Sequence, residues 1–224
     1  MPRLIATLTM IICLATCCLA GEARVPLETE IPEEVLAGTP PEVVAMLFPG
    51  LEKPLTEGKR PVFLVPKGTT NLALKKKVTS SDKNPVLGDL KYVTDGNKEG
   101  TEASYVELGP MKQWVQIDLE KRSTIYAVFL WHYFREARSY HDVILQVADD
   151  EKFSKNVRTV YSNDQDDSSG MGAGKSRGYI ETNLGKLLDA KGVVARYLRL
   201  YSRGNTANDL NHYIEVEVFG KPAS

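Results

Sequence analysis

The chain has 224 residues, of which 42% are hydrophobic and 25% are charged, and its formal net charge at pH 7 is −1. This length fits one domain with an appendage, or at most two small domains, and the composition is that of an ordinary globular protein. The near-neutral charge balance excludes the broad positive field with which proteins attract nucleic acid or an anionic membrane, so we expect neither as a partner.

Residues 1–20 have the pattern of a secretory signal peptide. Arg3 supplies a positive charge, an apolar stretch follows, and residues 18–20 (Cys-Leu-Ala) place small side chains at the cleavage positions. The stretch is too short to span a membrane, so we expect export with no span left after cleavage. The alternatives are a retained anchor and a lipid anchor at Cys17, although the preceding threonine departs from a lipobox. All three cysteines lie in this segment, so the secreted, periplasmic or surface-exposed protein would have no disulfide.

Residues 21–70 are a Pro- and Glu-rich N-terminal extension with one predicted small helix. Thr39 followed by Glu42 predicts a capping box, with Pro40 at the first helical position. The apolar face would comprise Val43, Val44, Leu47 and Phe48, and the helix would end at residues 49–50, Pro-Gly. Residues 61–66, with proline at both ends, could add an edge strand. We interpret the extension as a tether that packs against the domain.

From residue 71 the chain consists of short strands separated by turns. Residues 113–119 alternate between apolar and polar side chains, as a half-buried strand does. The crossover helices of a parallel α/β fold are missing, so the fold class that we predict is all-β, an antiparallel jelly-roll β-sandwich. The predicted strands are 71–79, 113–119, 124–133, 142–148, 158–161, 178–181, 196–202 and 213–219.

A series of motifs in this part of the chain resembles a discoidin domain, also called the coagulation-factor type C domain. The motifs are Asn-Leu-Ala-Leu at 71–74, Val-Thr-Ser-Ser at 78–81, Thr-Asp-Gly-Asn at 94–97, Trp-Val-Gln-Ile-Asp-Leu at 114–119, Arg-Tyr-Leu-Arg-Leu at 196–200 and Ile-Glu-Val-Glu-Val-Phe-Gly at 214–220. The resemblance covers residues 71–221. It implies the galactose-binding-like jelly-roll fold and, in lectin-like members, carbohydrate binding stabilised by calcium.

The turn at residues 94–97 is the predicted calcium site. Asp and Asn tolerate turn geometry and Gly accepts positive φ, so such a turn can aim a carboxylate and several carbonyls at one point, which suits calcium. The resemblance implies a structural ion that ties this turn to the last strand, with a possible further carbonyl from Ile214. Its implied ligands are Tyr92, Asp95, Asn97, Ser104 and Glu215. The alternative is that Asp95 only caps its own turn and that Glu215 is a solvated charge on an edge strand.

A ligand is expected at loops on one end of the sandwich. Residues 131–141 combine aromatic rings, which stack on sugars, with Arg and His donors, and residues 204–213 are rich in amides. The candidate ligand-binding residues are Asn84, His132, Tyr133, Arg135, Arg138, Asn208 and His212. The alternative is that the aromatic side chains are core and that the arginines pair with Glu136 or Asp142.

Two further motifs fail on spacing, and no catalytic residues are predicted. Residues 170–176 resemble a phosphate loop, but Ser169 stands where its first glycine is needed. Residues 164–170 resemble the start of an EF-hand loop, but Lys175 occupies the position of the bidentate glutamate. The sequence therefore predicts an exported, non-catalytic, lectin-like module whose partner is a glycan or glycoconjugate. The alternative is a protein–protein or cell-surface adhesion module on the same fold.

Overall fold

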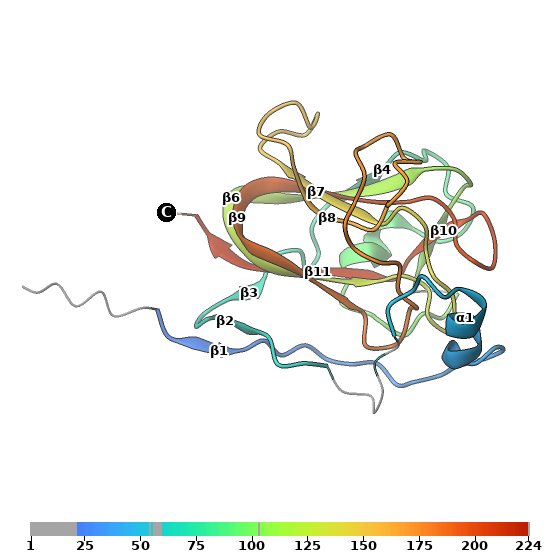
Figure 1. The fold of residues 1–224 in the computed structure, drawn as a ribbon. Helices are drawn as coiled ribbons and strands as arrows, with labels where there is room; N and C mark the ends of the chain where they lie inside the picture. The colour runs from blue at the N-terminus through green and yellow to red at the C-terminus, as the bar shows by residue number, and fades with distance from the viewer. Residues whose placement is uncertain (1–21, 54, 56–59, 103, 224) are drawn as a thin grey trace, which may run out of the picture.

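Two long antiparallel strands, β6 (Gln113–Trp131) and β9 (Lys186–Ser202), curve together from one layer of a sandwich into the other (Figure 1). The structure is a computed structural model that describes residues 22–53, 55, 60–102 and 104–223, so the predicted signal peptide lies outside the described residues. The other elements are β1 (Arg24–Pro26), α1 (Pro41–Leu47), β2 (Leu64–Pro66), β3 (Thr70–Asn71), β4 (Val78–Ser80), the 3-10 helix η1 (Leu90–Thr94), β5 (Val106–Leu108), β7 (Ile144–Ala148), β8 (Arg158–Ser162), β10 (Asn211–Tyr213) and β11 (Glu215–Pro222).

Each layer uses one half of β6 and one half of β9. In the first layer β11 lies between β3 and the second half of β6, which pairs in turn with the first half of β9. In the second layer β4 pairs with the first half of β6, and β9 continues to β7 and β8. The pairing of β6 with β9 breaks between Asp118 and Ser123, where Glu120 has a φ of +66°, so the strand can bend from layer to layer. The predicted antiparallel β-sandwich is confirmed.

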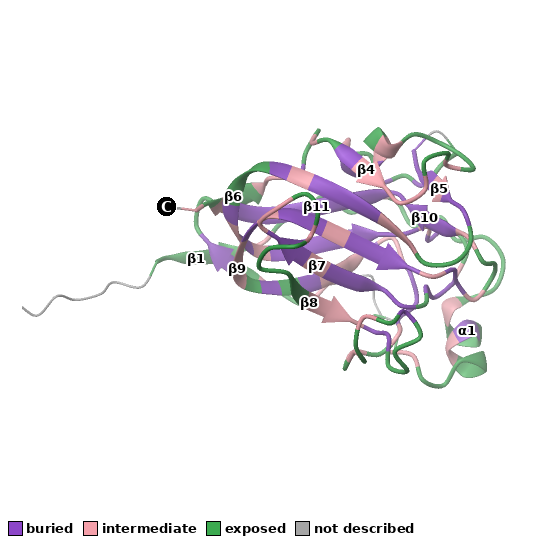
Figure 2. Cartoon of the chain, turned by 90° about the horizontal axis from the view of Figure 1, so that it is seen from above, coloured by how far each residue is buried: buried purple, intermediate pink, exposed green. Residues whose placement is uncertain are grey.

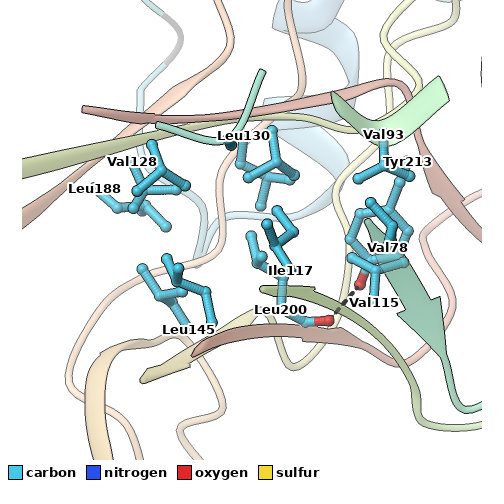
Figure 3. Packing of buried hydrophobic residues seen from close by; sticks show 14 of the residues in the cluster. Val78, Val93, Val115, Ile117, Val128, Leu130, Leu145, Leu188, Leu200 and Tyr213 are labelled. Carbon is cyan, nitrogen blue, oxygen red and sulfur yellow. Dashed lines mark hydrogen bonds between the residues drawn. The ribbon is translucent and has the colours of Figure 1, made fainter. Parts of the chain in front are cut away.

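The main core lies between the two layers. Alternate residues of the second half of β6, Val128 and Leu130, point inward from the first layer. Ile117 of the first half and Leu145 of β7 point toward them from the second layer (Figure 3). All of these side chains are buried, as the period of two along a strand requires when both layers contribute one face. Burial of this apolar surface is the main favourable term for folding.

The N-terminal extension covers the outer face of the first layer. Here the other alternate residues, Phe129 and Trp131, form a second apolar cluster with Phe219, and Leu27 and Phe63 of the extension pack on it. The guanidinium of Arg60 lies 4.4 Å from the ring centre of Phe129. In Figure 2 the strands of both layers are largely buried, whereas β1 and most of α1 are exposed. The extension therefore packs on the sandwich and is not a free tether.

A buried ion pair fastens this docking. The ammonium group of Lys98 lies 2.8 Å from the Glu217 carboxylate, and both side chains are almost fully covered. The Thr29 hydroxyl donates to the same carboxylate at 2.6 Å and accepts from Lys98 at 2.9 Å. A buried charge is tolerated only when it is paired and hydrogen-bonded, and here the extension supplies part of that pairing. No helix among the described residues is long and apolar enough to cross a membrane.

Several predicted elements are wrong in detail. The segment 178–181 forms no strand, and 71–79 is split into β3 and β4 by a turn in which Lys75 has a φ of +58°. The strands predicted at 113–119 and 124–133 are one continuous strand, and β9 begins ten residues before the predicted 196. The short strands β5 and β10 were not predicted, because three residues give no measurable alternation.

The predicted capping box of the small helix is also wrong. Pro40, not Thr39, is the N-cap residue, and no side chain caps the helix. Only Val44 of the predicted apolar face is buried. Val43, Met46 and Leu47 of α1 stay exposed.

Candidate functional site

The turn at 94–97 lies against the first residue of β11. The backbone N–H of Gly96 donates to Oε2 of Glu215 at 3.1 Å, although the two residues are 119 positions apart in the sequence. Gly96 has a φ of +92°, which a glycine adopts without strain. The negative charge of Asp95 lies near enough to Glu215 to raise the pKa of that carboxyl. The structure therefore brings together the two predicted carboxylates from opposite ends of the domain.

Glu215 is a buried acid without a counter-charge of its own. Its side chain is 0% exposed, and its Oε1 has no hydrogen-bond partner among the described residues. Burial, reinforced by the nearby charges of Glu217 and Asp95, raises the pKa of Glu215 to about 9. The alternative that it is a solvated edge charge is wrong. An orphaned carboxylate oxygen beside a second carboxylate fits a hard cation such as calcium, which takes carboxylate, carbonyl and hydroxyl oxygens.

The other predicted calcium ligands lie on the same loop or directly before it. Tyr92 is in η1, which leads into the turn, and the Asn97 N–H donates to Oδ1 of Asp95 at 2.8 Å. Ser104 is buried, and its hydroxyl donates to the Thr101 carbonyl at 3.0 Å. A Cβ added to Gly100 would lie 2.9 Å from Cδ1 of Ile214, so the loop packs closely on the residue before Glu215.

A second group of carboxylates, Asp142, Asp164 and Asp166, has oxygen atoms within 4.8 Å of one another. It differs from the Glu215 site because its buried members are already engaged. Asp164 accepts the N–H groups of Ser168 and Ser169, each at 3.0 Å, and Asp142 accepts the Ser168 hydroxyl at 3.0 Å. These hydrogen bonds explain the group as the frame of the loop between β8 and β9.

A large hollow lies at the loop end of the sandwich, and we call it the end-loop pocket. Its volume is about 910 Å³. Its lining comes from the stretches 47–51, 110–111, 139–142, 163–168 and 203–209, together with Gly178. Four loops of the sandwich and the end of α1 therefore meet around one space, which is large enough for a sugar residue or a short oligosaccharide.

One buried amide, that of Asn211 in β10, holds two of these loop segments together. Oδ1 of Asn211 accepts from the Ser202 hydroxyl at 2.8 Å and from the Gly204 N–H at 2.9 Å. Its Nδ2 donates to the carbonyls of Gly109 at 2.8 Å and of Met111 at 3.0 Å. All four hydrogen bonds of the amide are satisfied, so Asn211 fixes the loops on either side of the pocket.

The polar wall of the pocket is formed by charged and hydrogen-bonding groups of the sandwich. Nη1 of Arg203 lies 3.7 Å from the Asp142 carboxylate, and burial raises the pKa of Asp142. His141 is exposed beside them, and its carbonyl accepts the Arg203 N–H at 2.9 Å. Asp209 and Thr206 line the same side. Such a wall can donate to and accept from hydroxyl groups.

Two of the predicted ligand-binding residues are buried instead. His132 is fully covered, stacks on Tyr140 with ring centres 4.2 Å apart, and its Nδ1 lies 2.7 Å from Oε1 of Glu181. His212 lies between Tyr140, whose hydroxyl is 2.8 Å from Nδ1, and Glu107, whose Oε2 is 2.9 Å from Nε2. A ligand at the surface reaches neither imidazole, so these two assignments are corrected to structural roles.

The remaining candidates do not converge on the end-loop pocket. Arg138 is buried, lies over the Tyr133 ring at 4.7 Å and pairs with Glu136 at 2.5 Å, as the alternative expectation held. Arg135 lies in a separate hollow of about 400 Å³ beneath residues 30–35. Asn84 and Asn208 are exposed, and the Asn208 side chain accepts from Asn205 at 2.8 Å inside its own loop.

Two of the loops that the sequence indicated, 131–141 and 204–213, contribute to this pocket, but the candidate residues within them do not line it. His141 and Asp142 end the aromatic segment 131–141 or follow it, and Arg203 precedes the amide-rich loop. The acidic loop at 164–170 also contributes, through Gln165, Asp166 and Ser168. Whether a polar side chain of these loops is exposed, and so can contact a ligand, depends on neighbours that are distant in the sequence.

The buried His212 predicts a loss of stability in acid. Burial, aided by the positive charge of Arg138 and by His132, lowers the pKa of His212 to about 3, against 6.5 in the unfolded chain. The unfolded state therefore binds the extra proton first, and the stabilisation that is complete above pH 6.5 is lost as the pH falls toward 3. The free energy of unfolding should fall by about 2 kcal/mol between pH 7 and pH 5 from this group alone, as measured by urea unfolding.

The matched variants are His212→Gln, which should remove most of this pH-dependent fall, and His141→Gln, which removes an exposed imidazole and should keep it. The compared quantity is the difference between the two pH values, so a general destabilisation by either substitution cancels. An equal fall in both variants would contradict the assignment.

Comparison with protein-family models finds no match, and comparison with curated proteins finds no significant one. Among solved structures, a family 89 glycoside hydrolase from Clostridium perfringens in complex with GlcNAc-α-1,4-galactose aligns with a TM-score of 0.51 at 17% identity, covering 68% of this chain but 15% of the hydrolase. The CBM32 of AlyQ in complex with 4,5-unsaturated mannuronic acid aligns at 0.46 and 23% identity, covering 64% of this chain and 93% of that module. A fucose-binding module from Streptococcus pneumoniae aligns at 0.46 and 19% identity, covering 69% and 98%.

These alignments concern the fold. The chain shares its β-sandwich fold with the matched part of the hydrolase, in agreement with the fold that the resemblance to discoidin domains implied. The matched part of the hydrolase is a small share of that enzyme.

Proposed function

We propose that this protein is a non-catalytic carbohydrate-binding module whose glycan lies in the end-loop pocket. The observation that carries the proposal is the mixed lining of that pocket: Leu47, Phe48 and Met111 are apolar, whereas Asp142 and Arg203 are charged. Sugars present an apolar C–H face and a rim of hydroxyl groups, and a site with both characters matches them. The solved structures that resemble this chain include carbohydrate-binding modules. The sugars of those modules are therefore the first ligands to test.

We also propose a structural calcium ion between the Asp95 turn and Glu215. The support is Oε1 of Glu215, which has no hydrogen-bond partner among the described residues, and the hydrogen bond that ties this carboxyl to the turn containing Asp95. Asp95 and Glu215 would hold the ion, which would join segments over a hundred residues apart and neutralise a buried acid. The role is stabilising and keeps the loop end in place.

Export is part of the same proposal. The pattern of residues 1–20 supports secretion to the periplasm or the cell exterior, with a lipid anchor at Cys17 as the variant, and a cysteine-free mature chain fits either compartment. Mass spectrometry of the protein from its own cells would find the N-terminus at residue 21 if the signal is cleaved there.

A glycan array tests the central proposal. The full mature chain, fluorescently labelled, should bind a restricted set of glycans on an array that includes fucose, mannuronic-acid and glucosamine oligosaccharides and GlcNAc-α-1,4-galactose. Binding should persist in calcium and weaken in chelator as the loops loosen. Absence of binding to every glycan in both buffers would overturn the carbohydrate proposal.

The second candidate function is protein or cell-surface adhesion, and one observation favours it. Met46 and Leu47 of α1 are 81% and 69% exposed, and exposed apolar side chains grouped at one place are typical of protein contacts. A purified partner that binds in a 1:1 complex, and that no array glycan displaces, would support adhesion over carbohydrate binding.

A further inference from the structure

The N-terminal extension supplies one wall of the end-loop pocket. This wall consists of residues 47–51 (Leu-Phe-Pro-Gly-Leu), and none of them is charged. The charged residues of the lining, among them Asp142, Arg203 and Asp209, belong to loops of the sandwich. The extension therefore contributes only uncharged residues to the pocket, whereas the charged ones come from the sandwich.

We infer that the N-terminal extension is part of the recognition site, with Phe48 as the aromatic platform on which the bound sugar ring stacks. The inference rests on the proposed carbohydrate function and deepens it. It assigns a specificity-determining residue to a segment that the sequence presents only as a tether.

The wall is fixed in place and is not a loose end. The Glu52 N–H donates to the Gly178 carbonyl at 2.7 Å, and its carboxylate pairs with Lys186 at 2.6 Å. Before the helix, the Ala37 N–H donates to the Arg135 carbonyl at 2.7 Å. A Cβ added to Gly178 would lie 2.7 Å from Cδ2 of Leu51, so the two segments are in direct contact. Anchors on both sides of α1 hold Phe48 at the pocket, as a preorganised platform requires.

Phe48 itself is held by backbone contacts while its ring stays available. Its N–H donates to the Val44 carbonyl at 3.0 Å, and its carbonyl accepts the Leu51 N–H at 3.2 Å. The side chain is 40% exposed although it lines a pocket, and Val44 alone of the helix is buried. Keeping an aromatic ring in water is unfavourable unless something covers it, and a sugar ring is an apolar surface of suitable size.

The chain offers a matched control two residues away. Met46 is 81% exposed and belongs to the same helix, but it does not line the pocket. Phe48→Ala and Met46→Ala therefore remove apolar side chains of similar size from neighbouring positions, one inside the proposed site and one outside it.

The ligands are the glucosamine, fucose and mannuronic-acid oligosaccharides and GlcNAc-α-1,4-galactose of the array. Titration calorimetry measures the affinity of the full mature chain for each of these that the wild type binds. Phe48→Ala should weaken binding about tenfold, Met46→Ala less than twofold, and Phe48→Trp should restore wild-type affinity because an aromatic face returns. Phe48→Leu keeps the apolar bulk against the sandwich and should still lose affinity.

Each outcome decides the inference. Limited proteolysis should cut all four variants and the wild type at the same rate in the extension, which shows that the wall stays docked. If Phe48→Ala and Phe48→Leu bind as tightly as the wild type while Arg203→Ala does not, the extension is no part of the site and the carbohydrate function stands. A wild type that binds none of these sugars overturns both.

Discussion

Chelation of calcium should lower the midpoint of thermal unfolding of this protein by about 10 °C. An ion that binds only the folded state adds about 4 kcal/mol when it is present at about a thousand times its Kd, and each kcal/mol moves the midpoint of a chain of this size by about 2–4 °C. The reason to expect so large an effect is Glu215, a fully buried carboxyl with an unpartnered oxygen beside the Asp95 turn. Differential scanning calorimetry with calcium and with chelator measures the shift.

Three variants locate the ion. Asp95→Ala and Glu215→Gln should abolish the shift between calcium and chelator, whatever they do to the midpoint itself. Asp166→Asn alters the other carboxylate group and should leave the shift intact. A midpoint that chelation does not move would contradict the calcium site, and a shift that only Asp166→Asn removes would put the ion at the loop between β8 and β9.

Arg203→Ala should weaken binding of the array glycans about 10- to 100-fold without changing the thermal midpoint. Hydrogen bonds from a charged donor are worth about 1.5–3 kcal/mol, and a factor of ten in affinity corresponds to about 1.4 kcal/mol. Arg203 lines the pocket, and its contacts with Asp142 at 3.7 Å and with the Ser168 carbonyl at 3.4 Å both use Nη1, so Nε and Nη2 are left for a ligand. Its guanidinium carries several donors in a rigid fork, so Arg203→Lys should recover only part of the loss.

Arg177→Ala is the matched control for Arg203→Ala. Arg177 is an exposed arginine next to the lining residue Gly178, but it does not line the pocket itself. Its loss should leave affinity within twofold of the wild type. Equal losses in both variants would mean that a general positive charge, not the pocket, attracts the glycan, and a salt titration would then confirm the long-range effect.

The sandwich and the turn at 94–97 followed from local patterns, whereas the resemblance to discoidin domains implied that Asp95 meets Glu215. The alternation in 113–119 marks a strand wherever it lies, and the turn at 94–97 needs glycine at a φ of +92° in any context. The ligand residues did not follow, because His132 and His212 carry their polar partners, Glu181 and Glu107, from distant parts of the chain. A histidine at the end of a strand has the same sequence signal whether a carboxylate buries it or water surrounds it.

The place of the extension at the pocket could not be predicted from the sequence for a related reason. Its proline and glutamate content indicates a loose tether, and its helix is too short to be stable alone. Contacts with Gly178 and Lys186 hold it, and glycine and lysine are among the commonest surface residues. Only the three-dimensional arrangement shows that Phe48 lies at the pocket.

The covering of the first layer by the extension sets the boundaries of the folded unit. The motifs begin at residue 71, but a fragment cut there would lay bare the aromatic rings of Phe129, Trp131 and Phe219 and separate the carboxylate of Glu217 from Thr29. Such a fragment would self-associate through these exposed rings. Its aggregation could then be mistaken for a property of the end-loop pocket. The minimal working protein therefore starts near residue 22, some fifty positions before the recognisable part of the sequence.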